Sequence, residues 1–199
     1  MKVIDVGIGL ERIAWLYNGS ATSYSDTFAH ALSVLQNKIE VPHDDELWEK
    51  YGPYSCTLNI DEVEDIEAEW QVLADRIGEP IERVKTGIQL TKDVYIILDH
   101  TRTILICISD GSLPSNVGGG GNVRNILRRV FFLLKKNDWW GKVGGIEGLL
   151  EIFEAHKVDL EGVYGKFAEY KSFGEIIRVE HERWLHTDDV QADNLRKHI

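Results

Sequence analysis

The chain has 199 residues, and 33 acidic side chains against 22 basic ones give it a formal net charge of −11. With 43% hydrophobic and 28% charged residues, it has the composition of a globular protein rather than a disordered one. The excess of acid argues against a protein that coats nucleic acid without regard to sequence. Cys56 and Cys107 are too few for a disulfide framework or a zinc knuckle and fit a reducing compartment. No apolar stretch reaches the roughly 20 residues of a membrane helix, and the N-terminus has no signal-peptide pattern, so we expect no membrane association and a cytoplasmic location.

The charge is unevenly distributed along the chain. Glu40–Trp70 contains eleven acidic residues and a single lysine, whereas Arg124–Lys142 contains six basic residues and a single aspartate. We therefore expect one acidic face and one basic helix. The acidic segment is interpreted as a solvated surface, or as one that repels nucleic acid from the wrong side.

Helical periodicity dominates the chain, and we predict an all-α, multihelical fold with one short strand at its start. The strand is expected at Met1–Gly9. Helices are expected at Leu10–Asn18 before Gly19, Asp26–Asn37, Asp61–Ile77 (capped by Asp61 or Asn59 and ended by Gly78), Thr91–Asp110, Val123–Lys136, Ile146–His156 and Phe173–Ile199. Pro80 is expected to restart the chain at a helical first turn. Gly111–Gly121, with Pro114 and five glycines, is the main break between helices. No repeat and no linker between autonomous domains is apparent.

The first segment that suggests a function is Asp5–Arg12. Gly7 and Gly9 turn the expected strand into the expected helix, and backbone N–H groups at a helix start bind anions. Arg12, one turn into the helix, offers a planar guanidinium to a phosphate. Glycines at this spacing also occur in ordinary tight turns that carry a surface arginine, so the segment alone leaves both interpretations open.

The second segment runs from Asp99–Arg102 through a loop at Pro114–Asn116 and a glycine run into Arg124, Arg128 and Arg129. This order suits a polyanion that lies over the loop, with its phosphates fixed by basic side chains and an edge read by Asn116. A capped helix–loop–helix without a ligand is the simpler interpretation of this segment taken alone.

Together and in this order, the two segments resemble alanyl-tRNA synthetase, a class II aminoacyl-tRNA ligase, in its archaeal form. Asp5–Arg12 is similar to the third class II motif, Asp-Thr-Gly-x-Gly-Leu-Glu-Arg, and Asp99–Arg102 with Asp110–Gly120 is similar to the family's helical tRNA-recognition region. The resemblance spans Val3–Lys136, and Glu180–Trp184 fits the charged helix that follows. It implies the end of a catalytic core at residues 1–18 and a helical bundle of the tRNA-recognition type at residues 19–199.

The resemblance implies one contact to ATP. Arg12 matches the arginine that binds the phosphates of ATP in the family. Gly7 and Gly9 would shape the floor of the ATP pocket, and Glu11 would lie beside it. The intact enzyme uses ATP together with Mg. Val6 stands where the family has threonine, which removes a hydroxyl from this turn. The family's first two motifs are missing from the chain. We therefore expect a fragment or split product that forms no alanyl-adenylate alone, binds no cofactor alone and partners the rest of the synthetase.

The resemblance also implies that the chain binds the acceptor stem of tRNA-Ala. Asn116 matches the asparagine that reads a guanine–uracil wobble pair, whose guanine 2-amino group is free in the wide, shallow minor groove of an A-form helix. A neutral amide accepts from that amine without the desolvation cost of a buried charge. Ser115 and Arg102 belong to the same motifs. The flanking phosphates would be held by Arg124, Arg128 and Arg129. Lys135 and Lys136 are further candidates for phosphate contacts.

Two features of the chain depart from the complete tRNA-recognition pattern. The family's second reader of the wobble pair, an aspartate, would lie beyond Ile199, and Gly121 stands at a normally aromatic position. Two alternatives of other classes therefore stay open: a free-standing synthetase-like paralogue without ligase activity, and a helical interaction module whose acidic face docks a partner.

The remaining candidate sites have structural interpretations. His181 and His186 are five residues apart and do not share a helical face, so we interpret them as structural or surface residues rather than metal ligands. The family's zinc-bearing editing motif is missing from the chain. Trp139-Trp140 is interpreted as a buried corner rather than a base-stacking platform. Met1–Gly9 would leave an unpaired strand edge, so we predict that it is displaced or pairs with another copy.

Overall fold

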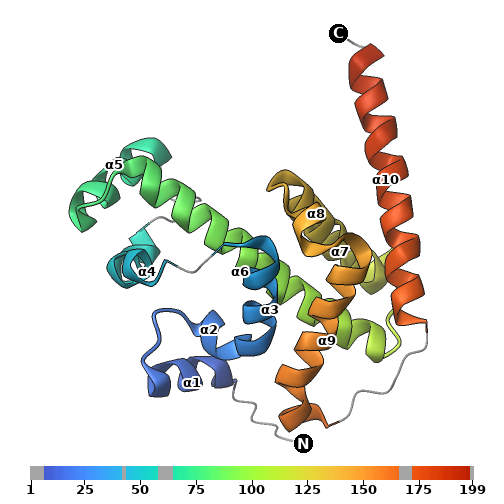
Figure 1. Ribbon diagram of the computed structural model, residues 1–199, viewed down its shortest axis with the longest axis horizontal. Coiled ribbons are helices and arrows are strands. Elements are labelled where there is room, and N and C mark those ends of the chain that lie inside the picture. Colours follow the sequence, from blue (N-terminus) through green and yellow to red (C-terminus); the bar gives the residue numbers. More distant parts are fainter. Residues whose placement is uncertain (1–6, 42–43, 58–64, 166–171, 198–199) are drawn as a thin grey trace, which may run out of the picture. The chain divides into compact units, whose positions relative to one another are not determined.

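A computed structural model describes residues 7–41, 44–57, 65–165 and 172–197 (Figure 1). Its helices are α1 (Leu10–Asn18), α2 (Ser23–Thr27), α3 (Ala29–Ile39), α4 (Asp45–Tyr51), the 3-10 helix η1 (Gly52–Thr57), α5 (Ile66–Ile77), α6 (Ile81–Ser109), α7 (Gly118–Lys136), α8 (Trp139–Val143), α9 (Gly145–Tyr164) and α10 (Phe173–Lys197). These ranges contain no strand, so the predicted all-α class is confirmed. The expected N-terminal strand is not found: residues 1–6 lie outside the described residues, and 7–9 have no regular structure.

The chain folds into two compact units. The first comprises Met1–Ala29 and Pro42–Tyr95, and the second comprises His30–Val41 and Ile96–Ile199. The boundary after Ala29 falls within α3 and the boundary after Tyr95 falls within α6. Compactness does not test the family-based boundary between residues 18 and 19, which stays a prediction.

Helix ends follow local capping chemistry. Gly19 and Gly78 end α1 and α5 in the left-handed conformation, with φ of 68° and 72°, as the sequence predicts. The start of α5 differs from the prediction. Asp65 is its N-cap, and the carboxylate accepts hydrogen bonds from the backbone N–H groups of Glu67 and Ala68, both at 3.1 Å. The caps proposed from the sequence, Asp61 and Asn59, lie outside the described residues.

Other helices start or break where tertiary packing overrides local propensity. The predicted helix Asp26–Asn37 is divided at Phe28, whose side chain is buried, into α2 and α3. The helical turn predicted after Pro80 and the helix predicted at Thr91–Asp110 form one continuous helix, α6, which begins at Ile81. Val84 and Ile88 are fully buried and stabilise its first turns. Similarly, α9 continues to Tyr164, past the predicted end at His156.

The core of the first unit is aromatic. The ring of Tyr95 stacks on that of Tyr24, with centroids 4.4 Å apart, and lies 5.8 Å from that of Trp48, which meets Tyr51 edge-on. The Tyr95 hydroxyl is hydrogen-bonded to the hydroxyl of Thr22 at 3.0 Å. Burial raises the pKa of Tyr95 to about 12, so the phenol stays neutral at physiological pH.

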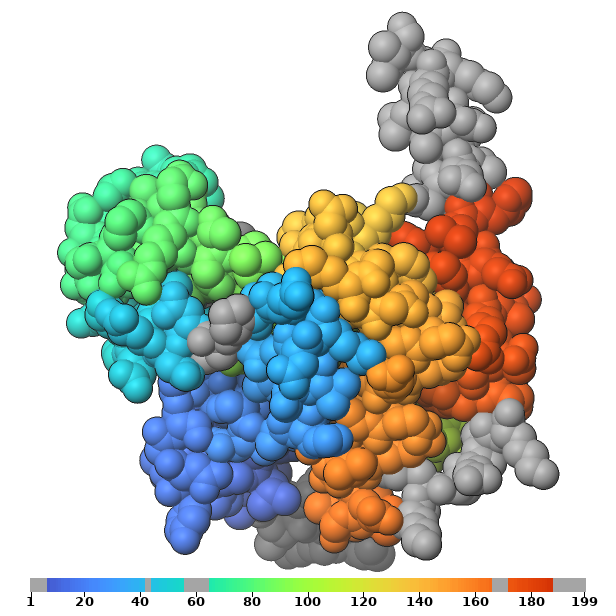
Figure 2. Space-filling model, viewed as in Figure 1, coloured from blue at the N-terminus to red at the C-terminus, as the bar shows by residue number. Residues whose placement is uncertain are grey.

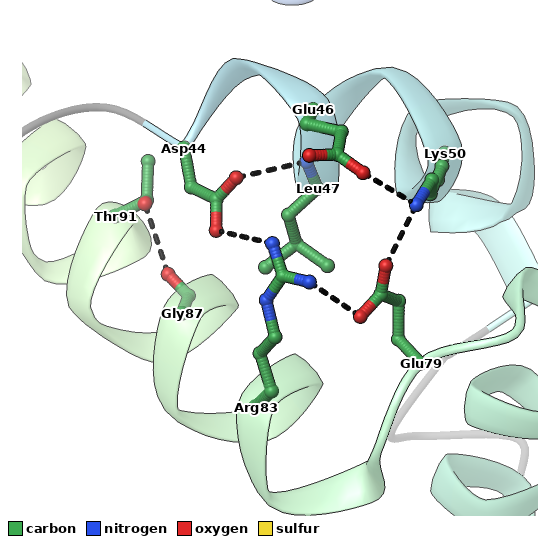
Figure 3. A network of polar contacts seen from close by, with 8 residues as sticks. All are labelled: Asp44, Glu46, Leu47, Lys50, Glu79, Arg83, Gly87 and Thr91. Atoms are coloured by element: carbon green, nitrogen blue, oxygen red, sulfur yellow. Dashed lines mark hydrogen bonds and ion pairs between the residues drawn. The ribbon is translucent and has the colours of Figure 1, made fainter.

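A polar network joins α4 to the start of α6 in the same unit (Figure 3). The Arg83 guanidinium donates to Asp44 at 3.2 Å and to Glu79 at 2.5 Å. Lys50 donates to Glu79 at 2.7 Å and to Glu46 at 2.8 Å. The hydrogen bond from Lys50, together with the guanidinium of Arg83, lowers the pKa of Glu79 despite its burial. Part of the acidic segment is thus neutralised by lysine and arginine.

In the second unit, α3 packs against α9. The Asp159 carboxylate accepts from the backbone N–H groups of His30 and Ala31, at 2.9 and 3.0 Å, and Lys38 pairs with Glu151 at 2.6 Å. Figure 2 shows α7 to α9, in yellow to orange, forming a continuous surface with α10, in red. Of the second segment singled out by the sequence, α7 carries the arginines Arg124, Arg128 and Arg129.

Candidate nucleic-acid interface

The loop between α6 and α7 begins with a tight helix end. Gly111, with φ of 91°, is left-handed, and its N–H donates to the carbonyl of Ile108 at 3.0 Å. The N–H of Ser112 donates to the carbonyl of Cys107 at 2.8 Å. This pair of bonds is a Schellman motif, which satisfies the last carbonyls of α6. It turns the chain sharply into the Pro114–Asn116 loop.

The loop closes back onto the first turn of α7. The N–H of Ser115 donates to the carbonyl of Gly120 at 3.0 Å, and the Ser115 hydroxyl donates to the carbonyl of Val117 at 2.8 Å. A Cβ on Gly120 would lie 2.4 Å from both the Leu113 carbonyl oxygen and the Ser115 Oγ. The glycine run was expected to lie before the helix, but Gly118–Gly121 form its first turn because the loop backbone needs this close approach.

Asn116 lies exposed at the tip of this loop and faces the basic helix. Its Oδ1 accepts a hydrogen bond from Nη1 of Arg124 on α7. Arg124 also reaches the Pro114 carbonyl at 3.4 Å through Nη2. One guanidinium therefore contacts both ends of the Pro-Ser-Asn sequence.

Arg124 is held in turn by Glu180 on α10. Its Nε donates to Oε2 at 2.7 Å and its Nη2 donates to Oε1 at 2.9 Å, a bidentate pair with 11% of the Arg124 side chain and 4% of the Glu180 side chain exposed. Burial raises the pKa of Glu180, but the hydrogen bonds and charges of Arg124 and Arg183 outweigh it, and the net pKa is lowered. The hydrogen bond to Glu180 raises the pKa of Arg124. The pair is therefore ionised at neutral pH.

An open pocket of about 240 Å³ adjoins this pair, between the loop and α10. It is lined by Leu113, Pro114, Glu175, Ile176, Val179, Glu180 and Arg183. Arg183 donates to Oε1 of Glu180 at 2.7 Å, with 57% of its side chain exposed. The sequence predicts a charged helix around Glu180. It gives no indication of the contact between Glu180 and Arg124, because the two residues are 56 positions apart.

The other predicted RNA contacts are distributed over α6 and α7. Arg128 lies four residues after Arg124 on α7 and is partly buried, whereas Arg129 is exposed. The Nε of Arg128 is buried without a hydrogen-bond partner within the described residues. Arg102 on α6 is partly buried. The pKa of Asp99 is lowered mainly by its hydrogen bond with His100, with a smaller contribution from the charge of Arg102.

The Asp99–Arg102 motif has a structural component. The hydroxyl of Thr101 is fully buried and bonds to Nε2 of His156 on α9 at 2.8 Å. Burial lowers the pKa of His156 to about 4, so the ring is neutral at pH 7. His100 bonds locally to the adjacent Asp99 at 3.3 Å. Thr101 thus fastens α6 to α9 rather than facing a ligand.

The residues predicted to contact ATP lie in the first unit. Gly9 is left-handed with φ of 75° and precedes α1, and the N–H of Arg12 donates to the Gly9 carbonyl at 3.0 Å. Gly7, Glu11 and Arg12 are all exposed. An exposed guanidinium one turn into a helix, beside glycines that leave the backbone open, fits one edge of a phosphate site.

Several other candidates have structural roles. Trp139 is buried as predicted, and Trp140 stacks on His181 with ring centroids 4.5 Å apart. Across the described part of the chain, no three His, Cys, Asp or Glu side chains gather in a way that would hold a metal ion. Over the same residues, every helix is too short or too polar to cross a membrane.

Comparison with known proteins places this geometry in context. Residues 1–192 match the family model described as tRNA synthetases class II (A). The chain is 34% identical to an alanine–tRNA ligase of Methanocella arvoryzae over 198 aligned residues. This alignment covers 100% of this chain and 22% of the relative. An alanine–tRNA ligase of Natronomonas pharaonis is 30% identical over 200 residues, covering 99% of this chain and 20% of the relative. The chain therefore spans about a fifth of the length of these curated relatives.

Proposed function

Because the chain belongs to the class II tRNA synthetase family, we propose that it is the tRNA-recognition part of an alanine–tRNA ligase. In this proposal it binds the acceptor stem of tRNA-Ala and reads the guanine–uracil pair with Asn116, while the rest of the synthetase supplies most of the catalytic site. The intact enzyme would attach alanine to its tRNA with ATP and Mg, in the cytoplasm. Residues 1–18 would be the end of the catalytic core, and residues 19–199 the recognition domain.

The observation that carries this proposal is the placement of Asn116. The amide is exposed at the tip of a closed loop, and its oxygen accepts from Arg124 on the basic helix. A carbonyl oxygen has two lone pairs, so one is left to accept from the 2-amino group of guanine. In a Watson–Crick pair that amino group is already bonded to cytosine, whereas in the wobble pair it is free in the minor groove.

The phosphates beside the wobble pair are assigned to Arg128 and Arg129 of α7. Arg129 is exposed, and Arg128 has a buried Nε without a hydrogen-bond partner among the described residues. An arginine fork binds phosphate oxygens well because its donors match their geometry. Ser115 supports the loop, and Arg102, Lys135 and Lys136 remain candidates for weaker contacts. Such contacts supply affinity without reading sequence.

A second, smaller contribution is assigned to the start of the chain. Arg12 would contact the phosphates of ATP in the intact enzyme, with Gly7 and Gly9 leaving room for them and Glu11 beside the pocket. ATP with Mg would supply the adenylyl group that is joined to the alanine carboxylate, with pyrophosphate as the leaving group. The exposure of Arg12 and the left-handed Gly9 support this assignment.

The test is binding of the 199-residue chain to two acceptor hairpins that differ only in a G·U or a G·C pair. We expect tighter binding to the G·U hairpin and loss of that preference in Asn116→Ala, by about 1–3 kcal/mol. Affinity for the G·C hairpin should persist, because phosphate contacts remain. Asn125→Ala is the matched control: it removes an exposed amide that lies on α7 rather than in the loop, and it should keep the preference for the G·U hairpin.

The other outcomes separate the alternative functions. Equal binding of the wild-type chain to both hairpins would refute wobble-pair recognition and favour a synthetase-like paralogue that binds RNA without this specificity. No binding to either hairpin at moderate salt would favour the protein-interaction module instead.

A further inference from the structure

Resting on the proposed function, we infer that Arg124 is a positioning residue that orients the Asn116 amide and that buried Glu180 sets the position of Arg124. The helix α10 would thus take part in reading the acceptor stem without touching it. The sequence suggested a different role for Arg124, as a direct contact to phosphate.

The chemistry of arginine determines which way the Asn116 amide points. A guanidinium has only donors, so the atom that faces Nη1 of Arg124 must be the amide oxygen. The Nδ2 group consequently points away from the arginine, and the second lone pair of Oδ1 stays available. Without Arg124, the exposed amide would rotate between both orientations. Only one of them presents an acceptor to the guanine amine.

Glu180 makes Arg124 a rigid support rather than a mobile cation. The carboxylate binds two nitrogens of the guanidinium, and the pair is almost completely buried. The guanidinium is planar, so fixing Nε and Nη2 against the carboxylate also fixes the direction in which Nη1 points. Nη1 is the nitrogen that donates to Asn116. The bond from Nη2 to the Pro114 carbonyl fixes the loop against the same group.

The same pairing argues against a phosphate contact for Arg124. Its positive charge is compensated by Glu180, and only 11% of its side chain is exposed. A residue that neutralises an RNA phosphate contributes to the salt dependence of binding. We therefore expect Arg124 to affect discrimination between base pairs and to leave the salt dependence unchanged.

The experiment compares three variants of the 199-residue chain by RNA binding and by NMR. Arg124→Lys keeps the charge beside Glu180, so the carboxylate stays compensated, but it lacks the planar fork. Glu180→Gln keeps the shape and weakens the support. Arg183→Gln removes the exposed cation that also donates to Glu180 and serves as the matched control. Thermal unfolding and circular dichroism of each variant confirm that it is folded.

In RNA binding, we expect the preference for the G·U over the G·C hairpin to fall about 5- to 100-fold in Arg124→Lys, as far as in Asn116→Ala. Glu180→Gln should reduce the preference in the same direction, and Arg183→Gln should keep it. The double variant Arg124→Lys/Asn116→Ala should lose no more than Asn116→Ala alone, because both act through one amide. The double variant Arg124→Gln/Glu180→Gln, which removes both charges of the pair, should keep the salt dependence of wild type, because Arg124 neutralises no phosphate.

The NMR readout needs no RNA. The two side-chain N–H signals of Asn116, assigned by their loss in Asn116→Ala, should be separated from random-coil positions in wild type and in Arg183→Gln. They should collapse toward those positions in Arg124→Lys and Glu180→Gln. Unchanged signals in Arg124→Lys, or full G·U preference in that variant, would overturn the inference. If the wild-type chain shows no G·U preference, wobble-pair recognition fails, and the NMR comparison still decides whether Arg124 orients the amide.

Discussion

Adding a single methyl group at Gly120 tests how the recognition loop is built. Gly119 and Gly120 are consecutive residues in the first turn of α7, and an added Cβ meets nothing within 4 Å at Gly119. At Gly120 the same Cβ would lie 2.4 Å from a backbone oxygen, that of Leu113. Ordinary contact begins at 3.4 Å, so the loop must move by about 1 Å, and backbone cannot rotate away as a side chain can.

The two substitutions should therefore change stability in opposite directions. Overpacking of this kind costs about 1–3 kcal/mol. Replacing glycine by alanine within a helix gains about 0.5–1 kcal/mol where space allows. We expect Gly119→Ala to raise the free energy of unfolding slightly and Gly120→Ala to lower it. The G·U preference should fall in Gly120→Ala only, because the loop carrying Asn116 is displaced.

Denaturant unfolding measures the stability difference, and amide hydrogen exchange locates it. The Ser115 N–H donates to the Gly120 carbonyl, so its protection should drop in Gly120→Ala and persist in Gly119→Ala. Equal stability of the two variants, or retained protection of Ser115 in Gly120→Ala, would refute the close approach of loop and helix.

Three further predictions concern the scaffold. The pKa of His156 is about 4 in the folded protein, compared with an ordinary value of 6.5. As the pH falls, the imidazole is therefore protonated in the unfolded state before it is protonated in the folded state. Between pH 6.5 and 4 wild type should lose about 3 kcal/mol more stability than His156→Gln, and parallel pH profiles of unfolding would contradict this. At Gly87, an added Cβ would lie 2.6 Å from the end of the Leu47 side chain, which can rotate. Gly87→Ala should therefore cost less than about 1 kcal/mol in thermal unfolding, and a larger loss would show that Leu47 is fixed. Asp65→Ala should cost about 1 kcal/mol and fray the start of α5 in hydrogen exchange, whereas Asp65→Asn, which keeps an accepting oxygen, should cost little; equal losses would exclude the cap.

The fold class and several helix ends were predictable because they depend on local chemistry. The glycines after α1 and α5 end those helices through their left-handed conformation. The buried stripe of Phe28, Ala31, Leu32 and Leu35 follows helical spacing, and all four side chains are buried. Local propensity failed at Phe28, where burial of the side chain accompanies a break in the predicted helix. The start of α6 at Ile81, in contrast, follows the helical first turn that Pro80 predicts.

The candidate site was predictable only in part. A motif resemblance pointed to Asn116 and Arg124, and the structure brings these two together. The motif gave no indication that Thr101 is buried against His156, because a motif lists residues without their partners. The contact between Arg124 and Glu180 joins helices far apart in the chain, and only the packing of α7 against α10 brings the two charges into contact.

The central claim, that Asn116 accepts a hydrogen bond from the free 2-amino group of guanine, has a direct test. Inosine lacks this amino group and keeps the rest of the wobble pair, so hairpins with G·U and I·U differ by a single donor. We predict that the wild-type chain binds the I·U hairpin about 5- to 100-fold more weakly than the G·U hairpin, and that Asn116→Ala binds both equally. Equal binding of wild type to the two hairpins would contradict the account.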